Sequence, residues 1–148
     1  LPIWAQALRA QTLRIDKGRN HTMANRIIII DDDRDFMEVM AGKLRSIGYD
    51  HFILEDNPEK AAAAFERGEL FDLALIDMTM PDMTGDQLAR HIRKIRPDMP
   101  VVICTGYSRN LAEAQISQVE NFKIAFKPLV MKELAELVRE ALAKGPKN

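Results

Sequence analysis

The sequence predicts an α/β protein with a doubly wound, five-stranded parallel sheet and helices on both faces. Short apolar runs alternate along the chain with helix-length amphipathic segments. The runs are apolar throughout rather than at every second residue, which is typical of strands buried on both faces. Strands that alternate with helices run parallel and connect through right-handed crossovers, so helices come to cover both faces of the sheet.

Five strand-helix units follow one another between residues 26 and 143. We expect strands at residues 26–31, 51–54, 71–76, 101–104 and 122–126. We expect helices at residues 34–47, 57–68, 85–95, 111–119 and 131–143, the fourth having the weakest pattern. Local signals mark several ends: Gly48 is a natural C-cap, Asn57 and Pro58 are an N-cap and a first helical residue, and Pro97 halts a helix.

Length and composition limit the class of protein. The 148 residues suffice for one domain with its own core. The 21 basic and 22 acidic residues nearly cancel, so no broad field favours nucleic acid or an anionic membrane. The single cysteine, Cys104, lies in an apolar run, which indicates a buried thiol and fits a reducing compartment. With no apolar stretch of ~20 residues, we expect a soluble cytoplasmic protein.

The two ends differ from the body of the chain. Residues 1–25 are expected to be a linker, a tail or a cloning remnant, because they lack the pattern of a signal peptide and Met23 could be a natural start. The spacing of Ile3, Trp4, Ala7 and Leu8 also allows a short amphipathic helix. Residues 144–148 are expected to be a tail without an effector, so the chain is predicted to be a stand-alone domain or a piece of a larger protein.

Charged side chains follow the predicted strands where each strand ends. Asp31 ends the first strand, with Asp32 and Asp33 after it, Asp77 follows the third and Lys127 the fifth. Ligands of open α/β sheets bind at the carboxyl ends of the strands, so these residues are expected at one edge. Two carboxylates repel by roughly 4 kcal/mol at about 4 Å in an effective dielectric near 20. An acidic cluster of this kind therefore needs a cation.

The motifs resemble those of a known family. They are Ile27 to Ile30 followed by Asp31-Asp32-Asp33, then Leu75-Ile76-Asp77-Met78-Thr79-Met80-Pro81-Asp82-Met83-Thr84-Gly85, Val101-Val102-Ile103-Cys104-Thr105-Gly106, and Lys127-Pro128. Together they resemble the receiver domain of two-component response regulators, over residues 26–143. The resemblance implies a flavodoxin-like sheet of order 2-1-3-4-5 and a phosphoryl group taken from a histidine kinase.

The resemblance also implies roles for individual residues. Asp77 corresponds to the phosphoacceptor, a carboxylate nucleophile. Asp31 and Asp32 correspond to the acidic pair that holds Mg²⁺, Asp32 directly and Asp31 partly through water, with Asp77 and the carbonyl of Thr79 as further ligands. This set would make the protein a Mg²⁺-dependent phosphoprotein of a phosphorelay rather than an enzyme.

Lys127 and Thr105 correspond to the residues that contact phosphoryl oxygens, the former as a point charge. None of the three histidines looks like a donor, so the donor is expected on a partner, a histidine kinase or a histidine phosphotransfer protein. Asp33 is expected to cap the following helix. Ile124 stands where the family commonly has an aromatic side chain that swings inward on phosphorylation, so that form of switching is not expected.

Two other hypotheses fit part of the pattern. Asp31 and Asp33, Thr105-Gly106 and Lys127 also resemble three motifs of haloacid-dehalogenase-type phosphatases, with Asp31 as nucleophile and Asp33 as general acid. That hypothesis leaves Asp77 without a role. The other hypothesis is a receiver-like adaptor that signals through protein contacts without phosphorylation.

Overall fold

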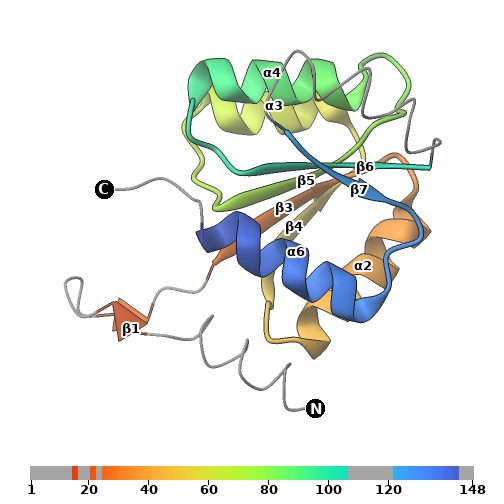
Figure 1. Ribbon diagram of the computed structural model, residues 1–148. Coiled ribbons are helices and arrows are strands. Elements are labelled where there is room, and N and C mark those ends of the chain that lie inside the picture. Colours follow the sequence, from red (N-terminus) through yellow and green to blue (C-terminus); the bar gives the residue numbers. More distant parts are fainter. Residues whose placement is uncertain (1–14, 17–20, 23–24, 107–121, 144–148) are drawn as a thin grey trace.

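A five-stranded parallel sheet is the centre of the molecule (Figure 1). The computed structural model describes residues 15–16, 21–22, 25–106 and 122–143. The sheet has the order β4-β3-β5-β6-β7. Its strands are β3 (Arg26–Ile30), β4 (His51–Glu55), β5 (Leu73–Asp77), β6 (Val101–Thr105) and β7 (Lys123–Phe126). Counted within this sheet, the order is the predicted 2-1-3-4-5.

Helices cover both faces of the sheet (Figure 1). Among the described residues, α2 (Arg34–Ser46) and α6 (Met131–Ala143) lie on one face, and α3 (Pro58–Glu66) and α4 (Gly85–Ile95) lie on the other. Each face has its own apolar core, one built with Leu44 and Leu134 and the other with Phe65 and Leu88. The doubly wound α/β class predicted from the sequence is therefore confirmed.

Four consecutive isoleucines show why the strands are apolar at every position. Ile27 and Ile29 belong to the core under α2 and α6, whereas Ile28 and Ile30 belong to the core under α3 and α4. Successive side chains of a strand point to opposite faces, so a strand covered on both sides needs an apolar residue at each position. All four side chains are buried.

The predicted helix boundaries hold closely, and the predicted strands differ by one or two residues. Residues 85–95 and 131–143 are helical as predicted, and Gly48 and Gly68 end the first two helices with φ of 101° and 89°. Phe71 was expected in a strand but lies before β5, which begins at Leu73. It is buried and packs against Phe65 at 5.1 Å between ring centroids. An apolar run in the sequence indicates buried residues, and a residue such as Phe71 can be buried without pairing in the sheet.

The amino-terminal segment contains an element that the sequence did not predict. β1 (Ile15–Asp16) pairs antiparallel with β2 (His21–Thr22). The helices expected at residues 3–8 and 111–119 and the tail at 144–148 lie outside the described residues. Within the described ranges, no helix is both long and apolar enough to span a bilayer.

Candidate functional site

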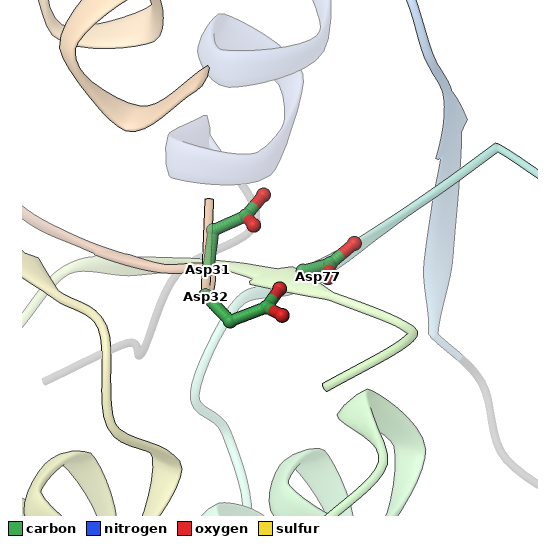
Figure 2. A group of neighbouring side chains, drawn as sticks. All are labelled: Asp31, Asp32 and Asp77. Atoms are coloured by element: carbon green, nitrogen blue, oxygen red, sulfur yellow. The ribbon is translucent and has the colours of Figure 1, made fainter. Parts of the chain in front are cut away.

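Three carboxylates gather at the carboxyl edge of the sheet, as the strand ends predict (Figure 2). Asp31 and Asp32 follow β3, and Asp77 is the last residue of the neighbouring β5. Each of the three offers a carboxylate oxygen, and these oxygens all lie within 4.8 Å of one another. Asp31 and Asp77 are buried, whereas Asp32 is exposed. The cluster therefore opens to solvent on the side of Asp32.

Lys127 reaches this cluster from the end of the edge strand β7. It directly follows β7, and its Nζ donates hydrogen bonds of 2.9 Å to Asp31 Oδ2 and to Asp77 Oδ1. Strand β6 separates β5 from β7 in the sheet, so the long lysine side chain spans the width of one strand. The Lys127 side chain is only 23% exposed. The arrangement of two acidic strand ends and one lysine is the one that the sequence predicts.

The turn after β3 fixes Asp31. Its Oδ1 accepts a hydrogen bond of 2.9 Å from the backbone N–H of Asp33, while Oδ2 accepts from Lys127. Asp33 in turn accepts from the N–H of Phe36 at 3.1 Å and is the N-cap of α2, as predicted. A capping carboxylate satisfies a free helix donor and faces the positive end of the helix dipole. The third acid of the triplet is thus a structural residue.

A tight backbone approach fixes the loop after Asp77. The N–H of Gly85, the first residue of α4, donates to the carbonyl of Met78 at 2.8 Å. A Cβ at Gly85 would lie 2.3 Å from the carbonyl oxygen of Asp77. That distance is well inside van der Waals contact, so only glycine fits without a shift of the backbone. The N–H of Met78 donates to the carbonyl of Cys104, which ties the phosphoacceptor candidate to β6.

Burial changes the acidity of the site. Removal from water raises the pKa of Asp77 from 3.8 to about 6, and Asp31 and Asp32 contribute in the same direction, against the hydrogen bond from Lys127. Burial alone would lower the pKa of Lys127, but hydrogen bonds and charge attraction from Asp31 and Asp77 outweigh it and the pKa is raised. The lysine therefore stays charged and the ionised form of Asp77 is destabilised.

Two other predicted site residues lie near this cluster. Thr105 is buried at the end of β6, and its carbonyl accepts a hydrogen bond of 2.9 Å from the N–H of Lys127. Thr79 is exposed and lies two residues after Asp77. The predicted contacts of the Thr105 hydroxyl and of the Thr79 carbonyl with ligand atoms remain predictions. Ile124 is half buried in β7 and pairs with Ile103 of β6.

The donor set fits a hard divalent cation. All three clustered ligands are carboxylates, and oxygen is the donor that Mg²⁺ prefers. If all are ionised, three carboxylates and the Lys127 ammonium carry a formal charge of −2, which one divalent ion would balance. Mg²⁺ usually keeps several waters and takes one or two protein carboxylates, so an exposed Asp32 beside a buried Asp77 suits it.

One residue at the site was not predicted. Phe36, in the first turn of α2, places its ring with the centroid 4.1 Å from Lys127 Nζ. The sequence identified Phe36 only as part of the apolar face of this helix. The available signal was its position, the first apolar residue after the three acids.

Comparison with known proteins agrees with this geometry. The family model of the response regulator receiver domain matches residues 27–139. The response regulator receiver protein CpdR of Brucella abortus is 31% identical over 119 residues, which cover 79% of this chain and 96% of CpdR. A receiver domain protein (CheY-like) from Methanospirillum hungatei superimposes with a TM-score of 0.72 at 30% identity, over 81% of this chain and 94% of that one.

The sheet order and the acids and lysine at its carboxyl edge define a doubly wound α/β domain with a charged site at that edge. The chain belongs to the family of response regulator receiver domains of two-component phosphorelay signalling. Some relatives are much longer. The chain covers 26% of the response regulator protein FleR of Pseudomonas aeruginosa, at 32% identity over 127 residues, and 14% of the sensor kinase CckA of Brucella abortus, at 25% identity.

Proposed function

We propose that Asp77 accepts a phosphoryl group and that Asp31, Asp32, Lys127 and Thr105 support the transfer. The observation that carries the proposal is Lys127 Nζ lying 2.9 Å from both Asp31 and Asp77. The Asp77 carboxylate is buried beside the Lys127 ammonium group. Once Asp77 is phosphorylated, this ammonium could contact an oxygen of the phosphoryl group. A lone strand-end aspartate would be a turn residue, but here three acids and one lysine meet.

In the proposed reaction a carboxylate oxygen of Asp77 attacks phosphorus. The new O–P bond forms an acyl phosphate as the P–N bond of a donor phosphohistidine breaks, and the leaving imidazole keeps the electron pair and takes up a proton. Bound Mg²⁺ would neutralise charge on the transferring group. Asp32, Asp77 and the Thr79 carbonyl would hold the ion, with Asp31 partly through water. The Lys127 ammonium and the Thr105 hydroxyl would each contact a phosphoryl oxygen.

The partner that supplies the phosphoryl group is proposed to be a histidine kinase or a histidine phosphotransfer protein. The described histidines are assigned to other elements: His21 begins β2, His51 begins β4, and His91 lies on α4 and contacts Glu66 at 2.8 Å. The chain is accordingly proposed to be a signalling phosphoacceptor and not an enzyme with a separate substrate. Direct contact with nucleic acid is not part of the proposal, and a cytoplasmic location stays a prediction of the sequence.

The domain limits and the output surface are also proposals. Residues 26–143 would form the receiver, residues 1–25 a linker, tail or remnant, and residues 144–148 a tail. The resemblance assigns output to the surface formed by β7, by the helix expected at residues 111–119 and by α6. Residues 111–119 lie outside the described residues. Ile124 has no hydroxyl or ring, so output is proposed to change without an aromatic swing at this position.

The family match does not favour the phosphatase and adaptor hypotheses. A phosphatase would use Asp31 as nucleophile, yet both of its carboxylate oxygens already accept hydrogen bonds, from Asp33 and from Lys127. Asp33, its general acid, is the N-cap of α2. The adaptor hypothesis leaves the buried acids and Lys127 without a role.

Intact mass measurement after incubation with Mg²⁺ and acetyl phosphate tests the proposal. The expected result is one added phosphoryl group in the wild type, none in Asp77→Asn, and none when a chelator removes Mg²⁺. An unmodified wild type would support the adaptor hypothesis. Continuous hydrolysis of generic phosphate esters, unaffected by Asp77→Asn, would support the phosphatase.

A further inference from the structure

The ammonium group of Lys127 has a third neighbour besides the two acids. The centroid of the Phe36 ring lies 4.1 Å from Nζ, within the range of a cation–π contact. Phe36 is half buried and packs against the core formed with α2 and α6. The ring is therefore held by the core on one side and presented to the ammonium on the other.

The start of α2 explains why residue 36 reaches Lys127. Asp33 caps the helix by accepting the N–H of Phe36, and the same turn supplies the N–H that Asp31 accepts. Asp31, one of the two acids that bind Lys127, and the ring that faces Lys127 are thus set by one short turn. A single local structure fixes two of the three neighbours of the ammonium group.

Helix α2 also holds the segment that follows Lys127. Lys43 lies two helical turns after Phe36, and its Nζ donates a hydrogen bond of 2.7 Å to the carbonyl of Leu129. Ser46 Oγ lies 3.4 Å from Met131 Sδ. Contacts at Lys127, Leu129 and Met131 run along one side of α2, so this helix positions the whole segment between β7 and α6.

We propose that Phe36 is a positioning residue for phosphorylation, acting through Lys127. Its ring keeps the ammonium group between Asp31 and Asp77 and takes space that water would otherwise occupy. In low dielectric the attraction between the ammonium and developing charge on the phosphoryl oxygens is stronger than in water. This inference rests on the proposed function and adds a residue that touches neither the phosphoryl group nor the ion.

Phe36→Leu tests the proposal, because leucine keeps an apolar side chain but has no ring face. With acetyl phosphate and saturating Mg²⁺, the rate of phosphoryl gain at Asp77 is expected to fall about three- to tenfold. Phe36→Tyr keeps the ring face and should restore most of the rate. Thermal unfolding of each variant shows whether it is folded.

Phe52→Leu is the matched control. Phe52 is also half buried, and the Arg45 guanidinium lies 4.8 Å from its ring centroid. It pairs with Ile27, toward the amino end of β3 and away from the acidic edge. Phe52→Leu is expected to lower stability as Phe36→Leu does, while the rate of phosphorylation stays near that of the wild type.

A double-mutant cycle with Lys127→Met separates positioning from packing. If the ring acts through the ammonium, Phe36→Leu has little further effect on the slow rate of Lys127→Met. An equal loss with and without Lys127, or a Phe36→Leu rate equal to that of the wild type, would overturn the inference. A wild type that gains no phosphoryl group would instead refute the proposed function. In that case the same double-mutant cycle, measured in the free energy of unfolding, would still show whether Phe36 and Lys127 interact.

Discussion

Strand β3 ends in four consecutive isoleucines, and the residues that directly follow it are acidic. Ile27 to Ile30 are buried between two layers of helices, and their burial stabilises the fold. Asp31, the next residue, is 2% exposed and is tolerated because Lys127 and the N–H of Asp33 satisfy its carboxylate. One strand thus carries the core and, directly after it, the site.

Substitutions in the strand interior and at its charged end should change different properties of the protein. Replacing an interior isoleucine removes stabilising contacts but leaves the acids in place. Replacing an acid at the edge removes the proposed chemistry and relieves an unfavourable charge. Stability and function are therefore expected to move in opposite directions when Asp77 is replaced and independently for interior substitutions.

The largest effect on stability is expected in the strand interior. Ile28 is 1% exposed and lies in the core under α3 and α4. Ile28→Ala should lower the free energy of unfolding by about 2–5 kcal/mol, because it removes apolar contacts and leaves a cavity. Urea unfolding measures the loss. The folded fraction should still gain a phosphoryl group from acetyl phosphate, and failure to do so would contradict the separation of core and site.

The next effect is expected where edge and core meet, at Gly85. Gly85→Ala places a Cβ against the Asp77 carbonyl, which must move to relieve the overlap. Crowding of this kind typically costs about 1–3 kcal/mol. Phosphorylation should slow as well, because the backbone of the nucleophile shifts. Gly42→Ala is the matched control, since Gly42 has open space around its Cβ position. It should neither lower stability through crowding nor slow phosphorylation.

A gain in stability is expected at the acidic edge itself. A carboxyl pKa of about 6 in place of 3.8 means that folding disfavours the ionised Asp77 by about 3 kcal/mol. Because the folded carboxyl keeps its proton to higher pH than the unfolded one, its contribution to stability falls as pH rises from about 4 to about 6. Asp77→Asn cannot ionise, so without Mg²⁺ it should be about 1–3 kcal/mol more stable than the wild type above this range.

Chemical unfolding across this pH range checks the sign. The advantage of Asp77→Asn should shrink toward pH 4, where the folded wild type is itself protonated at this position. Added Mg²⁺ should stabilise the wild type more than the variant, because the variant lacks one of the three clustered carboxylates. A variant less stable than the wild type at high pH would show that the Lys127 contact outweighs the burial of Asp77.

The smallest effect is expected at a surface hydrogen bond. Glu66 and His91 join α3 to α4 at 2.8 Å, but their side chains are 56% and 40% exposed. Glu66→Gln should change the free energy of unfolding by less than about 1 kcal/mol. It should leave the phosphorylation rate unchanged. A larger loss in urea unfolding would mean that this pair holds the two helices together more than its exposure indicates.

Much of the site follows from the sequence because strand ends are visible in it. The runs before Asp31, Asp77 and Lys127 are apolar and short, and parallel strands bring their carboxyl ends together. The cap at Asp33 and the helices at residues 85–95 and 131–143 also follow from local signals. These features depend on one residue and its near neighbours.

Other features depend on how side chains pack, which periodicity does not encode. The spacing of Phe36 shows which face of α2 it occupies but not that its ring reaches Lys127. Because Phe71 is apolar and buried, the predicted strand begins at residue 71, two residues before β5 begins at Leu73. The pair β1 and β2 has two residues in each strand, too few for an alternating pattern.

Mapping the phosphoryl group along the chain is the most direct test of the account. Reduction of the acyl phosphate with borohydride converts the modified aspartate to homoserine, which tandem mass spectrometry of peptides can locate. We expect homoserine at position 77 alone, formed only when Mg²⁺ is present. Modification at Asp31 or Asp32, at a histidine, or at position 77 in the absence of any divalent ion would contradict it.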